Sequence, residues 1–228
     1  MHGVRWRGGE GAGYLAYNAK VSTQAMSGPY PIHVLDDDPS VRRGLNRLLT
    51  AHGWNVKPYA TVEEFERSGA IDAPGCLLLD LRMPGGSGLE LLARLHEADV
   101  VLGVLLMSAY GDVPTTVRAM RLGAVDFLTK PISEDRLLDA VNDAVARSVE
   151  RWGQRVESQQ LQERIGRLTP RERQVSSRVA NGLMNKQIAS ELGTSEKTVK
   201  VQRARALAKL EVDSVAELVR LLDRAAKP

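Results

Sequence analysis

Apolar and polar positions along residues 30–147 alternate in a way that predicts strands and helices in turn. Short apolar runs such as Ile32–Leu35 predict buried strands, and the stretches between them carry apolar residues at helical spacing. The expected strands are residues 32–35, 54–57, 76–79, 104–107 and 125–128, and the expected helices are residues 39–51, 61–67, 88–96, 113–122 and one that starts near 134. This order is typical of an α/β fold with a doubly wound parallel sheet, whose functional site lies at the carboxyl ends of the strands.

The helical pattern of the last of these elements continues past Leu138, because no proline follows until Pro170. Apolar residues recur along it at helical spacing, at Val141, Val145, Val149, Trp152 and Val156. We therefore expect a helical linker over residues 148–167 that continues the preceding helix. Self-pairing of this linker as a short coiled coil is an open alternative.

Residues 168–228 show an all-helical pattern that is divided by capping residues. Thr169 is the expected N-cap of a first helix, which Asn181–Gly182 end. Asn185 is the expected cap of a second helix, and Ser195 the cap of a third that runs to about Leu210. The apolar stripe of a fourth helix consists of Val215, Leu218, Val219 and Leu222.

Composition narrows the class of protein. Of the 228 residues, 43% are hydrophobic and 26% are charged, which is the balance of a chain that folds around a core. The single cysteine, Cys76, and four scattered histidines exclude a disulfide scaffold and a thiolate zinc site. Because no apolar run approaches the roughly 18 residues of a membrane span, we expect a soluble, cytoplasmic protein without a membrane partner. The glycine-rich residues 1–29 are expected to be a disordered extension.

Charge is distributed unevenly along the chain. Residues 26–148 carry twelve basic and seventeen acidic side chains, a net charge of −5. Residues 149–228 carry sixteen basic and ten acidic side chains, a net charge of +6. An acidic part joined to a basic part indicates two domains with different partners, and the basic one is a candidate for binding nucleic acid.

Acidic residues follow two of the predicted strands. Asp36–Asp38 come directly after the first strand, and Asp80 comes after the third. Parallel strands open onto the same edge, so we expect these carboxylates to converge there. Like charges at short distance are costly unless a cation lies between them, and clustered oxygen ligands suit Mg²⁺. The alternative, that these residues only cap the first helix, accounts more easily for Asp38 than for the whole group.

A hydroxyl and an ammonium group are predicted at the same edge. Ser108 follows the fourth strand, and Lys130 follows the fifth. Together with a carboxylate nucleophile and Mg²⁺, these groups have the chemistry of a phosphoryl-binding site: the cations neutralise the phosphoryl oxygens and the hydroxyl donates a hydrogen bond.

These motifs resemble the receiver domain of two-component response regulators. The matching segments are Val34–Pro39, Leu79–Pro84, Ser108–Ala109 and Asp126–Pro131. The resemblance implies a flavodoxin-like five-stranded receiver over residues 30–147. It also implies that Asp80 accepts phosphate from a sensor histidine kinase, and that Mg²⁺ is bound by Asp80, Asp37, the backbone carbonyl of Arg82 and, through water, Asp36.

Further roles follow from the same resemblance. Lys130 would pair with the phosphoryl group, and Ser108 and Phe127 would form the pair of residues that changes position on phosphorylation. A plain core role for Phe127 stays open. The sequence departs from the usual pattern at Gly86, which lies in the glycine-rich segment 85–88, and we expect this loop to be unusually mobile.

The basic part of the chain contains a predicted helix-turn-helix. Residues 196–210 carry five Lys or Arg side chains and follow the tight turn Leu192–Thr194, which is the placement of a recognition helix. An ordinary solvated helix face is the alternative. Segments 168–175, 182–189 and 198–201 resemble the LuxR-type four-helix DNA-binding domain, over residues 168–228. A receiver with this domain is typical of the NarL/FixJ class, and the linker is most similar to the FixJ branch.

The second resemblance implies roles for exposed side chains of this domain. Lys200 and Val201 would meet bases, and Lys186, Thr198 and Arg203 would lie near phosphates. The stripe of Val215, Leu218, Val219 and Leu222 would supply a homodimer contact. The expected partners are a sensor histidine kinase, double-stranded DNA, a second copy of the chain on activation, and RNA polymerase.

Three functions are weighed. The first is a phosphorylation-dependent transcription factor, which is not an enzyme. The second is a Mg²⁺-dependent phosphatase or phosphotransferase, for which a carboxylate two residues after the nucleophile is expected; that position holds Arg82. The third is a DNA-binding protein whose receiver is only a dimerisation scaffold, although a scaffold has no need of clustered like charges.

Overall fold

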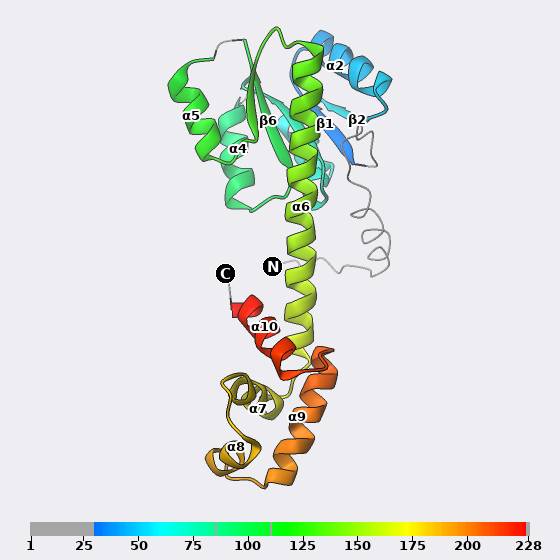
Figure 1. The fold of residues 1–228 in the computed structure, drawn as a ribbon. Coiled ribbons are helices and arrows are strands. Elements are labelled where there is room, and N and C mark those ends of the chain that lie inside the picture. Colours follow the sequence, from blue (N-terminus) through cyan, green and yellow to red (C-terminus); the bar gives the residue numbers. More distant parts are fainter. Residues whose placement is uncertain (1–29, 85, 110, 227–228) are drawn as a thin grey trace. The chain divides into compact units, whose positions relative to one another are not determined.

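The computed structural model describes residues 30–84, 86–109 and 111–226, which divide between Val149 and Glu150 into two compact units (Figure 1). The expected extension at residues 1–29 lies outside the described residues. Helix α6, Glu134–Gly166, begins in the first unit and ends in the second. The predicted continuation of the last receiver helix into the linker is therefore confirmed.

The first unit is built on a five-stranded parallel sheet in the order β2-β1-β3-β6-β7. Its strands are β1 (Pro31–Leu35), β2 (Asn55–Tyr59), β3 (Cys76–Asp80), β6 (Gly103–Ser108) and β7 (Asp126–Thr129). Its other helices are α2 (Pro39–Ala51), α3 (Val62–Arg67), the short 3₁₀ helix η2 (Ala70–Asp72), α4 (Gly88–Glu97) and α5 (Val113–Arg121). The sequence-based prediction of a doubly wound, flavodoxin-like sheet is confirmed.

One short element was not expected. Strands β4 (Arg82–Met83) and β5 (Gly86–Ser87) form a two-residue antiparallel ladder just after β3. The glycine-rich loop thus carries paired backbone at Gly86, where the sequence suggested only mobility, and Gly85 lies outside the described residues. Gly88, which begins α4, packs so closely that an added Cβ would lie 2.3 Å from the carbonyl oxygen of Asp80.

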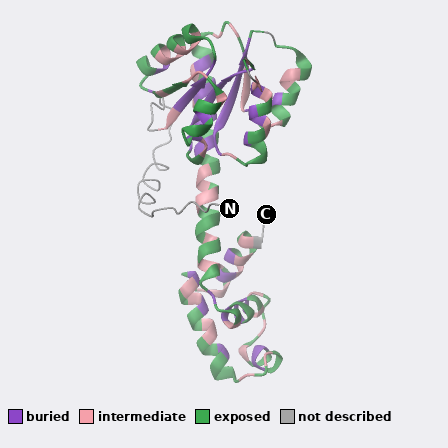
Figure 2. Cartoon of the chain, turned by 180° about the vertical axis from the view of Figure 1, so that it is seen from behind, coloured by how far each residue is buried: buried purple, intermediate pink, exposed green. Residues whose placement is uncertain are grey.

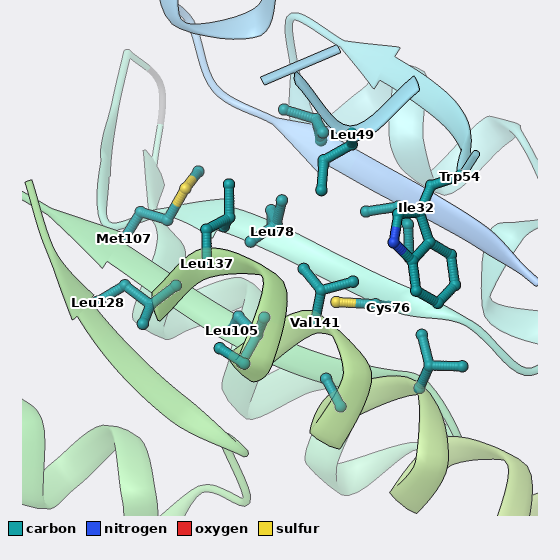
Figure 3. Packing of buried hydrophobic residues seen from close by; sticks show 14 of the residues in the cluster. Ile32, Leu49, Trp54, Cys76, Leu78, Leu105, Met107, Leu128, Leu137 and Val141 are labelled. Carbon is teal, nitrogen blue, oxygen red and sulfur yellow. The ribbon is translucent and has the colours of Figure 1, made fainter. Parts of the chain in front are cut away.

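The sheet is covered on both faces, and the strands at its centre are the most deeply buried (Figure 2). All five residues of β3 are buried, and the side chains of the first four alternate between two hydrophobic clusters. Cys76 and Leu78 pack in the cluster formed with α2 and α6, which is shown in Figure 3. Leu77 and Leu79 pack in the cluster formed with α3, α4 and α5. Burial raises the pKa of the Cys76 thiol, so this cysteine is an unreactive core residue.

Helix α6 is fixed against the first unit by two close contacts. The hydroxyl of the buried Ser148 accepts a hydrogen bond from the backbone N–H of Gly75, with an N···O distance of 3.0 Å. Gly103 at the start of β6 lies so near that an added Cβ would be 2.1 Å from the carbonyl oxygen of Ala144. The helix therefore packs on backbone at this point, and no larger side chain fits.

We expect Gly103→Ala to lower the free energy of unfolding of the first unit by about 1–3 kcal/mol or more, because the methyl group collides with backbone that cannot rotate away. Urea unfolding of the full chain measures the change. Gly44→Ala in α2 is the matched control: nothing lies within 4 Å of its added Cβ, and it should stabilise the helix by about 0.5–1 kcal/mol. Equal effects of the two substitutions would contradict the packing argument.

Over residues 150–226, the second unit contains four helices in addition to the end of α6. They are α7 (Pro170–Ala180), α8 (Asn185–Glu191), α9 (Glu196–Leu210) and α10 (Val215–Ala226). Their shared core includes Val175, Ile188, Val199 and Leu210. Thr169 forms a capping box with Glu172 at the start of α7, and the Ser195 hydroxyl accepts a hydrogen bond from the Thr198 N–H at the start of α9. The expected all-α domain is present, and so are the N-caps predicted at Thr169 and Ser195.

One expected cap is corrected. Asn185 is the first residue of α8, and the N-cap position is Met184. The backbone N–H of Met184 donates to the side-chain Oε1 of Gln187 at 2.8 Å. Gln187, the third residue of the helix, thus provides the hydrogen-bond acceptor for the N-cap N–H. The side chain of Asn185 instead accepts a hydrogen bond from Arg203 Nη1 at 3.4 Å, which joins α8 to α9.

Candidate functional site

Two carboxylates and one ammonium group meet at the carboxyl ends of three strands. Asp36 follows β1, Asp80 ends β3, and Lys130 follows β7. The Lys130 Nζ atom donates to Oδ2 of Asp36 at 2.7 Å and to Oδ1 of Asp80 at 2.6 Å. Both carboxylates are buried, with residue exposures of 1% and 7%. One ammonium group therefore contacts two buried carboxyl groups.

The second oxygen of each carboxylate is held by the backbone. The N–H of Asp38 donates to Asp36 Oδ1 at 2.9 Å, and the N–H of Arg82 donates to Asp80 Oδ2 at 2.7 Å. Burial alone would lower the pKa of Lys130, but its hydrogen bonds to the two carboxylates outweigh burial and raise the pKa above its ordinary value. The ammonium group is consequently charged throughout the physiological pH range.

The neighbouring acids Asp37 and Asp38 differ in role. Asp37 has an exposed side chain. Asp38 is the N-cap of α2, and its Oδ1 accepts the backbone N–H of Ser40 at 2.7 Å, which lowers its pKa. The capping interpretation of the sequence is therefore right for Asp38, whereas Asp36 and Asp80 form the buried cluster.

The described residues include carboxylate and carbonyl oxygens that could bind a cation, but they do not form a complete set of metal ligands. Over residues 30–84, 86–109 and 111–226, no three His, Cys, Asp or Glu side chains are grouped closely enough to hold a metal ion. The donor chemistry fits Mg²⁺ nevertheless, because Lys130 neutralises only one of the two buried carboxylates and oxygen is the ligand this ion prefers. Asp37, which directly follows Asp36 in the sequence, is available as a third carboxylate.

Ser108 ends β6, the strand that pairs with β3, and Phe127 lies on β7, the strand on the other side of β6. Ser108 is buried at the end of β6, and its carbonyl oxygen accepts the backbone N–H of Lys130 at 2.7 Å. Phe127 on β7 is half-buried and packs against the second hydrophobic cluster. A Cβ added at Gly111 would lie 3.3 Å from the Phe127 ring, so the loop after β6 passes close to that ring. Ser108 thus helps to position Lys130 through its backbone.

An open groove of about 510 Å³ lies beside this cluster. Its lining includes Leu81 and Arg82, which follow Asp80 directly, and Asp112 and Thr115 at the start of α5. Asp112 is the N-cap of α5 and accepts the Thr115 N–H at 2.7 Å. The groove is therefore lined by the residues that follow Asp80 and by the start of α5, and not by Asp36, Asp80 or Lys130 themselves.

In the second unit, the residues expected to meet DNA lie mainly on exposed positions of α8 and α9. Val199, Ala206 and Leu210 face the core and fix the orientation of α9. The exposed residues of the predicted set are Lys186, Thr198, Lys200 and Val201. Arg203 is half-buried, and its guanidinium group is held by Asn185. The structure thus presents one basic helix face to solvent.

The predicted dimer stripe on α10 is largely used within its own unit. Leu218 is buried in the core, and Val215 and Leu222 pack against that core. Val219 is half-buried, and Leu221, which the sequence pattern did not single out, is buried. In this conformation the stripe is not an open surface, and Leu218 in particular is not available to a second chain.

Sequence reasoning also missed a buried ion pair that links α7 to the recognition helix. Lys209 Nζ on α9 donates to Glu172 Oε2 at 2.7 Å, and Glu172 is only 2% exposed. The same carboxylate accepts the backbone N–H of Thr169 at 2.8 Å. These hydrogen bonds hold the pKa of Glu172 below its ordinary value of 4.5, and the hydrogen bond from Lys209 has the largest effect.

We expect Lys209→Met to lower the melting temperature of the second unit, because it leaves a buried carboxylate without its cation. Since the pKa of Glu172 is depressed in the folded state, the stabilisation is fully present above pH 4.5 and is lost as the pH falls through the lower folded-state value. Calorimetry of the full chain at a series of pH values should show that acid lowers the melting temperature of this unit less in the variant than in wild type. Lys197→Met, an exposed change on the same helix, is the control; a Lys209→Met protein with the wild-type pH profile would contradict the argument.

Comparison with known proteins decides the family. The description "Response regulator receiver domain" matches residues 32–142, and "Bacterial regulatory proteins, luxR family" matches residues 166–222. The chain is 42% identical over 191 residues to the transcriptional regulatory protein FixJ of Azorhizobium caulinodans, covering 84% of this chain and 90% of that protein. The chain belongs to the FixJ-like response regulators.

Other relatives agree with this assignment. Nodulation protein W of Bradyrhizobium diazoefficiens is 38% identical over 216 residues, covering 95% of this chain and 90% of the relative. The solved structure of the response regulator StyR superposes with a TM-score of 0.80 at 43% identity, covering 86% of this chain and all of that one. The chain is therefore a two-component response regulator that controls transcription, and its family consists of regulators, not enzymes.

The family assignment also fixes the coarse identity of the ligands. Receiver domains generally bind Mg²⁺ for phosphorylation and imply a histidine kinase as partner, and the LuxR-type domain implies DNA binding. None of the helices described for this response regulator is long and apolar enough to span a membrane.

Proposed function

We propose that Asp80 is the phospho-acceptor of this response regulator, and that its phosphorylation controls dimerisation and sequence-specific DNA binding. The observation that carries the proposal is the cluster in which Lys130 bridges Asp36 and Asp80 at the end of the sheet. In functional terms the chain divides into a receiver at residues 30–147, a helical linker at 148–167 and a DNA-binding domain at 168–228.

The proposed reaction is transfer of a phosphoryl group from a kinase phosphohistidine. A carboxylate oxygen of Asp80 attacks phosphorus, the P–N bond breaks, and the imidazole leaves and takes up a proton, so that an acyl phosphate forms. Hydrogen bonds from Lys130 and from the Arg82 N–H hold the two carboxylate oxygens of Asp80 in place at the strand end. After transfer, Lys130 keeps its contact with Asp36 and pairs with a phosphoryl oxygen.

Mg²⁺ would be held by Asp36, Asp37 and Asp80 with the carbonyl oxygen of Arg82, and would supply charge neutralisation at the phosphoryl oxygens. Ser108 would donate its hydroxyl proton to a phosphoryl oxygen, and Phe127 would respond through the neighbouring loop at Gly111. Movement of these two side chains would shift the receiver between two states.

The output proposed is binding of a homodimer to inverted half-sites on DNA, with Lys200 and Val201 at the bases and Lys186, Thr198 and Arg203 at phosphates. RNA polymerase is the further partner, and the cytoplasm the compartment. Exposure of Lys200, Val201, Lys186 and Thr198 supports the assignment.

The test is to treat the full chain with acetyl phosphate and Mg²⁺ and to follow intact mass, oligomeric state and DNA binding in the same samples. We expect one phosphoryl group per chain, with tighter dimerisation and DNA binding. An adduct that changes neither property would contradict the proposed output. Absence of an adduct, with DNA binding intact, would favour a receiver that acts only as a scaffold.

A further inference from the structure

The end of α6 is an integral part of the DNA-binding unit. Leu161 and Ile165 of this helix pack against the core that α7, α8, α9 and α10 share. The carbonyl oxygen of Ile165 accepts a hydrogen bond from Arg173 Nη2 at 3.1 Å. These contacts begin well before residue 168, so the last turns of α6 are a fifth helix of this unit rather than a free linker.

Charged side chains attach this segment to α10. Glu157 forms an ion pair with Arg224 near the end of α10. Arg164 pairs with Glu211, just before α10, at 3.1 Å. Between them, the Gln162 side chain donates to the carbonyl oxygen of Ala225 at 3.5 Å. The ion-paired side chains are one-third to three-fifths exposed, so each contact is weak and can be broken without unfolding the unit.

Helix α10 is consequently held on two different faces. Val215, Leu218 and Leu222 lie on the face that packs into the core. Glu217, Leu221 and Arg224 recur at the spacing of a second helical face, and these three residues line a groove of about 410 Å³ that Glu157 and Leu161 of α6 also line. Leu221 is also buried in the shared core, so the second face contacts α6 through a buried leucine that exposed ion-paired side chains and a partly open groove surround.

The charge pattern of this second face is self-complementary. Glu217 lies one helical turn before Leu221, and Arg224 lies about one turn after it. If two α10 helices met antiparallel about a two-fold axis at Leu221, Glu217 of each chain would lie opposite Arg224 of the other, with Leu221 of both chains at the middle. In the monomer, α6 presents Glu157 to Arg224 and lies along the same groove with Leu161. The end of α6 thus offers α10 the same acid and apolar residue that a second copy would offer.

We propose that the end of α6 occupies the face of α10 at which a second copy of the chain docks, so that DNA-binding units pair only after α6 has left this face. The inference rests on the proposed function, because it takes pairing of α10 helices as part of the active dimer. It places an autoinhibitory contact within the linker helix, independent of any contact that the receiver makes.

The test uses Glu157→Arg in the full chain without a phosphodonor. This change repels Arg224 and weakens the hold of α6, but it leaves every α10 residue unchanged. We expect the dissociation constant of the dimer, measured by sedimentation, to fall roughly fivefold, as loss of an exposed pair with added repulsion predicts. Glu163→Arg makes the same charge change at an exposed position off this face and should have no effect. A Glu157→Arg protein no more dimeric than Glu163→Arg overturns the proposal.

Arg224→Glu provides the opposite control. It also breaks the pair with Glu157, but it places a carboxylate opposite Glu217 of the second chain, so the protein should stay monomeric. The double variant Glu157→Arg/Arg224→Glu restores the contact with α6 in reversed polarity and should be monomeric too. Dimerisation of either protein to the level of Glu157→Arg would show that the chains pair elsewhere. If circular dichroism shows that Glu157→Arg is unfolded, the milder Glu157→Gln takes its place with the same expected direction.

A separate arm distinguishes this inference from the proposed function. Wild type treated with acetyl phosphate and Mg²⁺ tests whether phosphorylation drives dimerisation. Dimerisation there, with no gain from Glu157→Arg, rejects only the role of α6. A gain from Glu157→Arg, with no response of wild type to the phosphodonor, supports the role of α6 and rejects phosphorylation control.

Discussion

Asp80→Asn will abolish phosphoryl incorporation, and with it any response of oligomeric state and DNA binding to a phosphodonor. The amide has no anionic oxygen to attack phosphorus, and it ends the ion pair with Lys130. Intact mass after treatment with acetyl phosphate and Mg²⁺ measures the loss directly. The fold should survive, because the substitution removes one of two like charges that share a single ammonium group.

The matched control is Asp72→Asn, the same change at an exposed position of η2. It should incorporate one phosphoryl group, as wild type does. Full incorporation in the Asp80→Asn protein would place the acceptor elsewhere, and Asp36 would be the first residue to examine because Lys130 binds it equally closely. Loss of incorporation in both variants would point to a general effect on the receiver rather than to the chemistry of Asp80.

The sheet and its site could be predicted because they depend on local patterns. Each strand is a short apolar run that ends at a polar residue, and β3, with every residue buried, is the clearest example. Parallel pairing then brings the carboxyl ends of β1, β3 and β7 to one edge, so the meeting of Asp36, Asp80 and Lys130 there follows from a doubly wound parallel sheet. Asp38 shows the limit of this reasoning, since an acid at a strand end is also an acid at a helix start.

The features that were missed depend on contacts between distant segments. The Glu172–Lys209 pair joins positions 37 residues apart, and no periodicity in the sequence couples them. Glu157 and Arg224 likewise read as ordinary exposed charges on two separate helices. The apolar stripe of α10 was recognised, but a pattern shows only that a face is apolar, not whether the unit's own core or a second chain covers it. Leu218 is covered by the unit's own core, whereas Val219 of the same stripe is half-buried.

Lys200→Ala will weaken specific DNA binding by about 1–3 kcal/mol, or roughly 5- to 150-fold, and will relax the choice of base at one position of each half-site. Lys200 is exposed on α9, and its only described ion pair is with Glu196, one turn earlier, at 3.3 Å. Such a surface pair is weak, so the ammonium group is free to exchange it for a base edge. Binding of the phosphorylated chain to a duplex selected by wild type from a random library measures the loss.

Lys186→Ala provides the contrast, because Lys186 is exposed at the start of α8, where a phosphate contact is expected. It should weaken binding to all duplexes alike and reduce the slope of log affinity against log salt by about 1, as loss of one phosphate contact requires. Lys200→Ala, by contrast, should change which base is preferred at one position, whatever its effect on the slope. If both variants lowered affinity uniformly with the same change in slope, Lys200 would be a second phosphate contact. Base readout would then fall to Val201, a residue that is 43% exposed on the same helix. The salt series therefore assigns each residue of this surface to phosphate or base.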